Sequence, residues 1–156
     1  MLICLNDLFA CLGLTQTRKL LTNFSKNSFY LLPEPLRLGE FLTNYCKKGT
    51  ICYKEYFKVL FLNQANQILG YTLISEGGIT ETCADVRLIM QAALLTNSVA
   101  LILAHNHPSG NLKPSPEDIR LTKQVREASN FMRIKILDHI ILSDTEYYSF
   151  ADEGML

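Results

Sequence analysis

Residues 99–110 read VALILAHNHPSG, an apolar run that ends in two histidines and a turn. The run over 99–104 is short and continuous, which predicts a strand that is buried on both faces. Side chains at positions i and i+2 of a strand point to the same face, so His105 and His107 can both reach one ion just beyond the strand's end. Residues 108–110 (PSG) then turn the chain. The stretch therefore predicts a metal site at the end of a buried strand.

A carboxylate follows within the next dozen residues. Residues 115–118 (SPED) are typical of a helix start, with Ser115 as N-cap, a proline at the first helical position and acids in the first turn. Taken alone, Ser115-x-x-Asp118 is a capping box that satisfies backbone donors at the helix start. The preceding turn can also bring Asp118 over His105 and His107. Both roles can hold at once, because Ser115 can cap the helix while Asp118 points outward.

Two imidazoles, one carboxylate and a coordination position left for water are typical of a catalytic zinc site rather than a structural one. Zinc bound in this way lowers the pKa of its water from about 15.7 to roughly 7, so hydroxide is available at neutral pH. The donor set suits Zn²⁺, although iron or manganese would also be chemically reasonable. An isolated His-x-His is more often a surface pair, so this interpretation depends on the whole spacing together with the buried strand.

The spacing His105-x-His107, seven residues, then Ser115-x-x-Asp118 resembles the signature of the JAMM (MPN+) metalloproteases. The fuller string HNHPSG, with Pro-Ser at 114–115 and Asp-His-Ile-Ile at 138–141, resembles the RadC branch of that family. The similarity runs from about Tyr53 to the C-terminus. It implies a JAB/MPN-like α/β fold, in which a mixed β-sheet is flanked by helices in a cytidine-deaminase-like architecture.

The resemblance also implies roles for individual residues. His105, His107 and Asp118 would hold the zinc, and Ser115 would donate a hydrogen bond to the oxyanion. Glu55, at the start of an expected strand, matches the glutamate that holds and deprotonates the water in JAMM enzymes. The alternative for Glu55 is an exposed charge at a strand start. Glu76 and Glu81, in the turn after the next strand, are the competing candidates for the general base.

The activity implied by the resemblance is that of a zinc-dependent hydrolase, which cleaves a peptide or isopeptide amide in a peptide or protein substrate. Two alternatives stay open: a RadC-type DNA-repair-associated module, and a metal-binding scaffold without proteolytic turnover. Fifteen basic and fifteen acidic residues give a formal net charge of zero, so the chain has no global electrostatic attraction to nucleic acid. Direct nucleic-acid binding would need a local basic patch. The sequence determines neither the amide nor the oligomeric state.

Length and composition restrict the class of protein that carries this site. A chain of 156 residues is expected to form one domain, and 48% apolar residues exclude a disordered chain. Five cysteines form an odd set without CxxC spacing, which is typical of reduced thiols in a cytoplasmic protein. The apolar residues 1–5 are soon followed by Asp7, and no basic residue precedes them, so neither a signal peptide nor a membrane span is expected.

We divide the chain into an N-terminal helical or irregular extension, residues 1–50, and a RadC-like JAB/MPN metal-binding domain, residues 51–156. Larger RadC relatives carry a helix-hairpin-helix region before the metal domain, and residues 1–50 do not resemble one. Within the extension, the patterns predict a helix over 7–21, a loop or irregular strand over 23–35 and an amphipathic helix over 36–48.

In the metal-binding domain, strand and helix patterns alternate in an order that predicts a mixed sheet flanked by helices. Arg87 is expected to pair with a nearby acid, with a contact to substrate as the alternative. The third histidine, His139, is expected to make a structural hydrogen bond within the sheet rather than bind metal. The predicted elements are strands over 55–62 and 68–75, a helix over 85–97, a strand over 99–104, a helix from 115 to about 130, a strand over 133–142 and an edge strand near 147–150.

Overall fold

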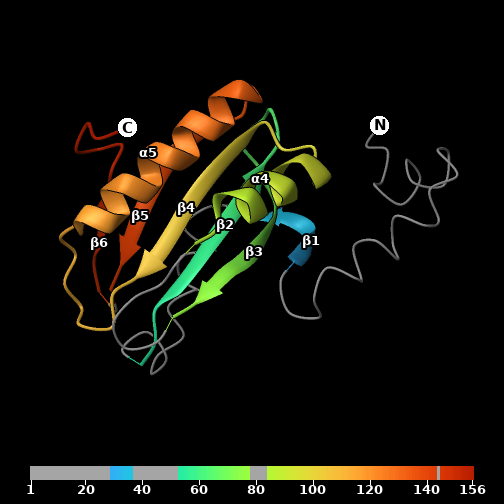
Figure 1. Ribbon diagram of the computed structural model, residues 1–156. Coiled ribbons are helices and arrows are strands. Elements are labelled where there is room, and N and C mark those ends of the chain that lie inside the picture. The colour runs from blue at the N-terminus through green and yellow to red at the C-terminus, as the bar shows by residue number, and fades with distance from the viewer. Residues whose placement is uncertain (1–28, 37–52, 78–83, 144) are drawn as a thin grey trace, which may run out of the picture.

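The computed structural model describes residues 29–36 (backbone only), 53–77, 84–143 and 145–156. These residues form one six-stranded sheet in the order β1-β3-β2-β4-β5-β6, with two helices on one of its faces (Figure 1). The elements are β1 (Phe29–Leu36), β2 (Tyr56–Leu62), β3 (Ile68–Glu76), α4 (Val86–Leu95), β4 (Ala100–Asn106), α5 (Pro116–Phe131), β5 (Lys135–Leu142) and β6 (Tyr147–Ser149). The predicted α/β class, a mixed sheet flanked by helices, is confirmed.

The sheet is mixed because β4 and β5 run parallel while its other neighbouring strands are antiparallel. A parallel pair cannot be joined by a tight turn, and α5 supplies the crossover between β4 and β5. β4 lies between β2 and β5, and all seven of its residues are buried. The run of apolar residues before the two histidines is therefore a central strand, as predicted.

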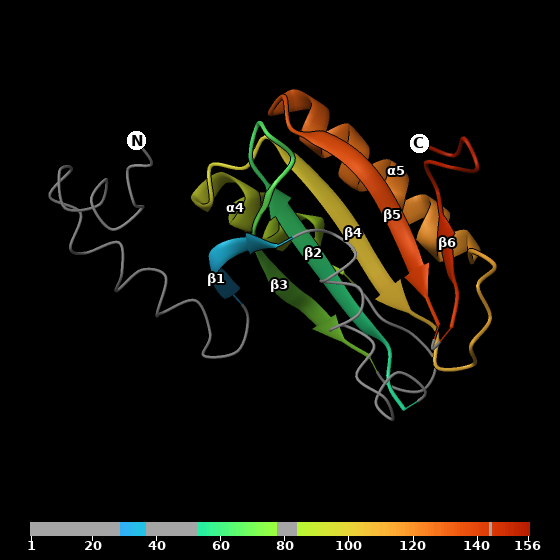
Figure 2. The same cartoon turned by 180° about the vertical axis from the view of Figure 1, so that it is seen from behind.

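The two faces of the sheet carry separate apolar clusters. On β4, Leu101 and Leu103 belong to the cluster beneath the helices, whereas Ile102 and Ala104 belong to the cluster on the opposite face. Among the described residues, no helix lies against that opposite face, which Figure 2 turns toward the viewer. Since side chains alternate along a strand, His105 continues the series of Leu101 and Leu103. It therefore points toward the helices, where α5 can meet it.

Both helices begin with side-chain caps. Asp85 accepts a hydrogen bond from the Arg87 N–H at the start of α4, and its carboxylate forms a 2.7 Å ion pair with the Arg87 guanidinium. The predicted pairing of Arg87 with an acid is confirmed. At the start of α5, Ser115 Oγ accepts from the Asp118 N–H and the Asp118 carboxylate accepts from the Ser115 N–H, so the capping box is confirmed as well.

Several observed bounds differ from the predicted ones by a residue or two, among them the end of β4 and the start of β5. β4 continues through His105 and Asn106, because its register with β2 and β5 extends past Ala104. β5 begins at Lys135, because Arg133 has a φ of 56° and its N–H bonds to the Asn130 carbonyl in a turn after α5. Of the stretch predicted over 23–35 as a loop or irregular strand, residues 29–35 lie in β1, an edge strand that pairs with β3 and whose register shifts between Leu31 and Leu36, so the irregular strand is confirmed there.

Some predictions fall outside the described residues. These are the helix over 7–21, nearly all of the helix over 36–48, and Glu81. The division of the chain at residue 50 stays a prediction, although β1 joins the same sheet as the later strands. Neither helix in the described part of the chain has the length and apolar character needed to cross a membrane.

Candidate metal centre

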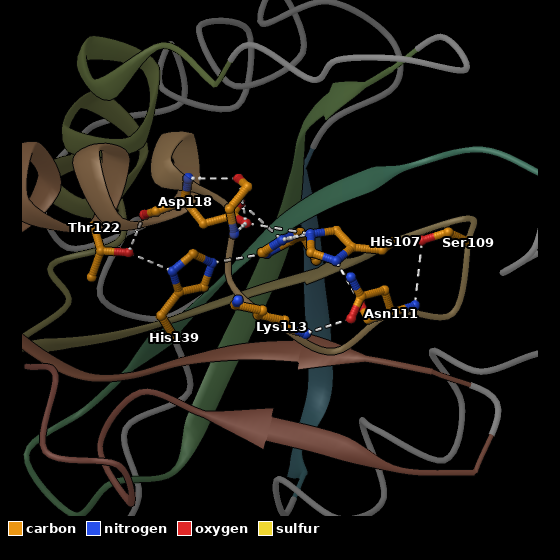
Figure 3. Close-up of polar contacts among 9 residues, drawn as sticks. His107, Ser109, Asn111, Lys113, Asp118, Thr122 and His139 are labelled. Atoms are coloured by element: carbon orange, nitrogen blue, oxygen red, sulfur yellow. Dashed lines mark hydrogen bonds and ion pairs between the residues drawn. The ribbon is translucent and has the colours of Figure 1, made fainter.

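Three side chains converge beyond the end of β4. His105 is in the strand, His107 follows it, and Asp118 lies in the first turn of α5. His105 Nε2 is 3.1 Å from Asp118 Oδ1, His107 Nε2 is 3.3 Å from Asp118 Oδ2, and the two Nε2 atoms are 3.0 Å apart. Figure 3 shows His107 and Asp118 facing each other from the loop and from the helix. The three residues form a group that could hold a metal ion.

The spacing of these atoms fits a metal ligand set. Tetrahedral zinc with bonds of about 2.0–2.1 Å holds its ligand atoms roughly 3.4 Å apart. His107 Nδ1 donates to the Asn111 carbonyl at 2.6 Å, because a carbonyl can only accept, so a neutral His107 presents the lone pair of Nε2 to the centre. A lone pair and a carboxylate this close repel each other unless a cation or a proton lies between them. The donor set and its spacing therefore suit a divalent cation.

Burial and hydrogen bonding act against each other at Asp118. Burial disfavours its charge, but when both imidazoles are protonated, the hydrogen bonds from His105, His107 and Ser115 outweigh that effect and hold the pKa of the carboxyl well below its usual range. Conversely, the hydrogen bond to Asp118 raises the pKa of His107 against the opposing effect of burial, and the charge of Glu55 adds to the increase. The centre therefore keeps its carboxylate ionised and ready for a cation.

Behind His105 lies a second polar contact that does not face the centre. His105 Nδ1 is 2.9 Å from His139 Nε2, and His139 Nδ1 is 2.6 Å from Thr122 Oγ1. Figure 3 shows His139 of β5 and Thr122 of α5 facing each other. Burial lowers the pKa of His139 well below its usual value, and its ring stacks on Phe150 with centroids 4.6 Å apart. His139 makes structural hydrogen bonds, as predicted. Its ring bonds to other side chains, however, and not to the backbone of the sheet.

The sequence analysis did not anticipate Thr122. It lies four residues after Asp118, so helical periodicity puts the two on one face of α5. That spacing was a usable signal, but threonine is too common in helices for the spacing alone to indicate a role.

Asn106, between the two histidines, was also missed. Its side chain points away from theirs, and its amide accepts from the Tyr56 N–H at 3.0 Å and donates to the Lys54 carbonyl at 2.8 Å. These two bonds hold the backbone on both sides of Glu55. The available signal was its position: a buried asparagine in a central strand must find hydrogen-bond partners.

Glu55 lies beside the centre. The last pair between β2 and β4 is Phe57 and His105, and that antiparallel register, continued for two residues beyond the strands, would set Glu55 opposite His107 on the same face. Its electrostatic effect on His107 agrees with this placement. The competing Glu76 forms a 2.8 Å ion pair with Lys54. The role of Glu55 as the general base stays a prediction.

Ser115 contacts a candidate ligand directly. Its hydroxyl and its backbone N–H each donate to Asp118 Oδ2 at 2.7 Å. The residue thus caps α5 and orients the Asp118 carboxylate at the same time. Its predicted role as a donor to an oxyanion stays a prediction.

The fold and the centre together define a mixed-sheet α/β domain with a His-x-His and aspartate group at the end of a central strand. Residues 34–155 match the family model for the RadC-like JAB domain, and the chain belongs to this family.

Curated relatives agree with this membership. The chain is 48% identical to the UPF0758 protein of Flavobacterium johnsoniae over 101 residues, which are 65% of this chain and 44% of that protein. It is 48% identical to the UPF0758 protein of Porphyromonas gingivalis over 104 residues, 66% of this chain and 46% of that protein. A UPF0758 protein of Salinibacter ruber is 45% identical over 103 residues, 66% of this chain and 44% of its own length. The match thus spans less than half the length of these relatives.

Proposed function

We propose that this domain is a zinc-dependent hydrolase of the JAMM type, which cleaves a peptide or isopeptide amide. The observation that carries the proposal is the convergence of His105, His107 and Asp118 on one point, with atom spacings that suit zinc. A divalent metal at such a centre lowers the pKa of a water molecule and polarises the scissile carbonyl.

In the proposed reaction, Glu55 takes a proton from the attacking water and delivers it to the leaving amine as the amide C–N bond breaks. Support for this role comes from the position of Glu55 opposite His107 and from the Asn106 amide, which holds the backbone on either side of it. Because the backbone is held at both flanking residues, the Cα position of Glu55 is restrained, which limits where its carboxylate can lie.

Ser115 is proposed to donate a hydrogen bond from its hydroxyl to the oxyanion that develops on the substrate carbonyl. Such a donor can contribute about 3 kcal/mol to transition-state stabilisation. Its hydroxyl is a free rotor, and the backbone N–H of Ser115 also bonds to Asp118 Oδ2. The carboxylate therefore keeps one hydrogen bond from Ser115 when the hydroxyl turns toward substrate.

The first test is the metal content of the purified protein, measured by elemental mass spectrometry beside a His105→Ala/His107→Ala double mutant. We expect about one zinc per chain in the wild type and none in the mutant. A wild-type protein that contains no metal and takes up none from added zinc would refute the proposed centre.

The second test separates a hydrolase from a scaffold that binds metal without turnover. Peptide and isopeptide substrates are screened with the zinc-loaded wild type and with Glu55→Gln. We expect Glu55→Gln to keep its zinc and lose activity, since the amide cannot accept the proton. Glu76→Gln is the matched control, because this glutamate pairs with Lys54, and its activity should persist. An unchanged rate in Glu55→Gln would overturn the assignment of the base.

A further inference from the structure

The contacts behind His105 form a continuous series of hydrogen bonds. Thr122 Oγ1 lies 2.6 Å from the Asp118 carbonyl and 2.6 Å from His139 Nδ1, and His139 Nε2 lies 2.9 Å from His105 Nδ1. All three side chains are at least 97% buried, so water cannot substitute for a missing partner. The series joins the helix that carries Asp118 to the strand that carries His105.

Counting donors assigns the proton of each bond. The Asp118 carbonyl can only accept, so the single hydroxyl proton of Thr122 is used there. Thr122 Oγ1 must then accept at its other contact, and His139 Nδ1 carries the proton of that bond. His139 has no exposed surface and lies against the rings of Phe57 and Phe150, surroundings that disfavour a charged imidazole. Its Nε2 is therefore an acceptor.

The last bond of the series determines which ring nitrogen of His105 carries the proton. Because His139 Nε2 accepts, His105 Nδ1 carries the proton and donates. The proton of neutral His105 is then absent from Nε2, the atom that lies 3.1 Å from Asp118 Oδ1. We infer that His139 and Thr122 are positioning residues of the metal centre: they hold His105 in the tautomer and ring orientation that presents Nε2 to the metal. This inference rests on the metal-binding part of the proposed function.

A change at Thr122 should propagate through this series. Without the hydroxyl, His139 Nδ1–H loses its acceptor, and burial then favours the other tautomer, with the proton on Nε2. That proton would face His105 Nδ1 and drive the His105 proton onto Nε2, where it competes with the metal. Loss of an outer partner of a metal-binding histidine typically lowers metal affinity by about 10–100-fold.

The test compares zinc affinity, measured by competition with a chelating dye, in matched pairs of variants. Thr122→Val keeps the shape but removes the hydroxyl, and Thr122→Ser restores it. His139→Leu removes both ring nitrogens, and His139→Gln restores one acceptor and one donor. We expect zinc affinity to fall by about 10–100-fold in Thr122→Val and His139→Leu, with recovery toward wild type in Thr122→Ser and His139→Gln.

A second measurement records the protonation sites directly. ¹⁵N-resolved imidazole spectra of the full metal-free chain should show protonated Nδ1 on His139 and on His105. Thr122→Val should move the His139 proton to Nε2. Urea unfolding of the metal-free variants measures the folded fraction of each, so that zinc affinity is compared only among folded proteins.

The outcomes distinguish this inference from the proposed function. If the wild type binds zinc and Thr122→Val binds it with equal affinity, the positioning role is overturned, whereas the proposed metal centre is not. A wild-type His139 protonated on Nε2 would overturn it independently of metal. Wild type that binds no zinc would refute the proposed function, whereas the imidazole spectra would still test the hydrogen-bond series.

Discussion

The two histidines of the centre are two residues apart, yet they are held in different ways. His105 belongs to β4, is fully buried and bonds to His139, whose own partner, Thr122, is on α5. His107 follows the strand, is partly exposed and bonds to the backbone carbonyl of Asn111 in the same loop. Tertiary packing therefore positions one ligand, whereas a local loop positions the other.

Because of this difference, changes that affect folding and changes that affect only metal binding should act on the centre through different histidines. The His105 ring also stacks on Phe57 at 5.8 Å, so its position is part of the core beneath the helices. Changes that loosen the core should reach the metal through His105. Changes confined to the loop should reach it through His107 and leave the core unaffected.

The largest effect is expected from removing each histidine separately. His105→Ala and His107→Ala should both abolish tight zinc binding. His105→Ala also opens a core cavity and leaves the buried Nε2 of His139 without a partner, so unfolding free energy should fall by about 3 kcal/mol. His107→Ala should lower it by less than about 1 kcal/mol. Urea unfolding of the metal-free proteins measures both values, and equal losses would contradict the comparison.

Ser115→Ala tests a residue that acts on the loop-facing side of the centre. The lost cap should lower unfolding free energy by about 1 kcal/mol. If the hydroxyl also serves the oxyanion, turnover of the zinc-loaded protein should fall roughly 100-fold. Steady-state kinetics with an amide substrate give the second value. Full turnover in the folded fraction would restrict Ser115 to its role as a cap.

Asn106→Asp addresses the side of the strand opposite to His105. The carboxylate keeps the acceptor for the Tyr56 N–H but cannot donate to the Lys54 carbonyl. We expect turnover to fall about tenfold through misplacement of Glu55. Zinc affinity should change by less than about threefold, since both histidines keep their partners. A drop in affinity as large as that of Thr122→Val would show that Asn106 acts through the ligands instead.

The smallest effect is expected from Gly110→Ala in the loop of His107. Gly110 has a φ of +72°, and a Cβ there would meet no atom within 4 Å, so the cost is purely conformational. We expect unfolding free energy to fall by about 1 kcal/mol through this strain, and zinc affinity to fall by up to about fivefold. Calorimetric zinc titration and urea unfolding measure the two quantities. If only the unfolding free energy falls and zinc affinity does not, the loop contributes to folding rather than to the position of His107, which would contradict the comparison.

The same division explains what could be predicted from the sequence. His105, His107 and Asp118 lie within one strand, turn and helix start, so local periodicity and capping rules were enough to bring them together. The run of apolar residues before them identified the central strand for the same reason.

The features that were missed depend on distant partners. Asn106 bonds to residues 50 and 52 positions away, and the partner of the predicted His139 hydrogen bond, His105, is 34 positions away. The extra length of β4 likewise depends on pairing with β2 and β5. No local pattern encodes such contacts, because they exist only once the sheet has formed.

The order of these residues along the chain has a consequence for synthesis. A nascent chain extended to Asp118 contains all three ligands, but His139 follows 21 residues later, on the strand that completes the parallel pair. Until β5 pairs with β4, the ring of His105 lacks its bond to His139 and with it the proposed restraint on its tautomer. We therefore expect the centre to mature late, after β5 has been synthesised and has paired with β4.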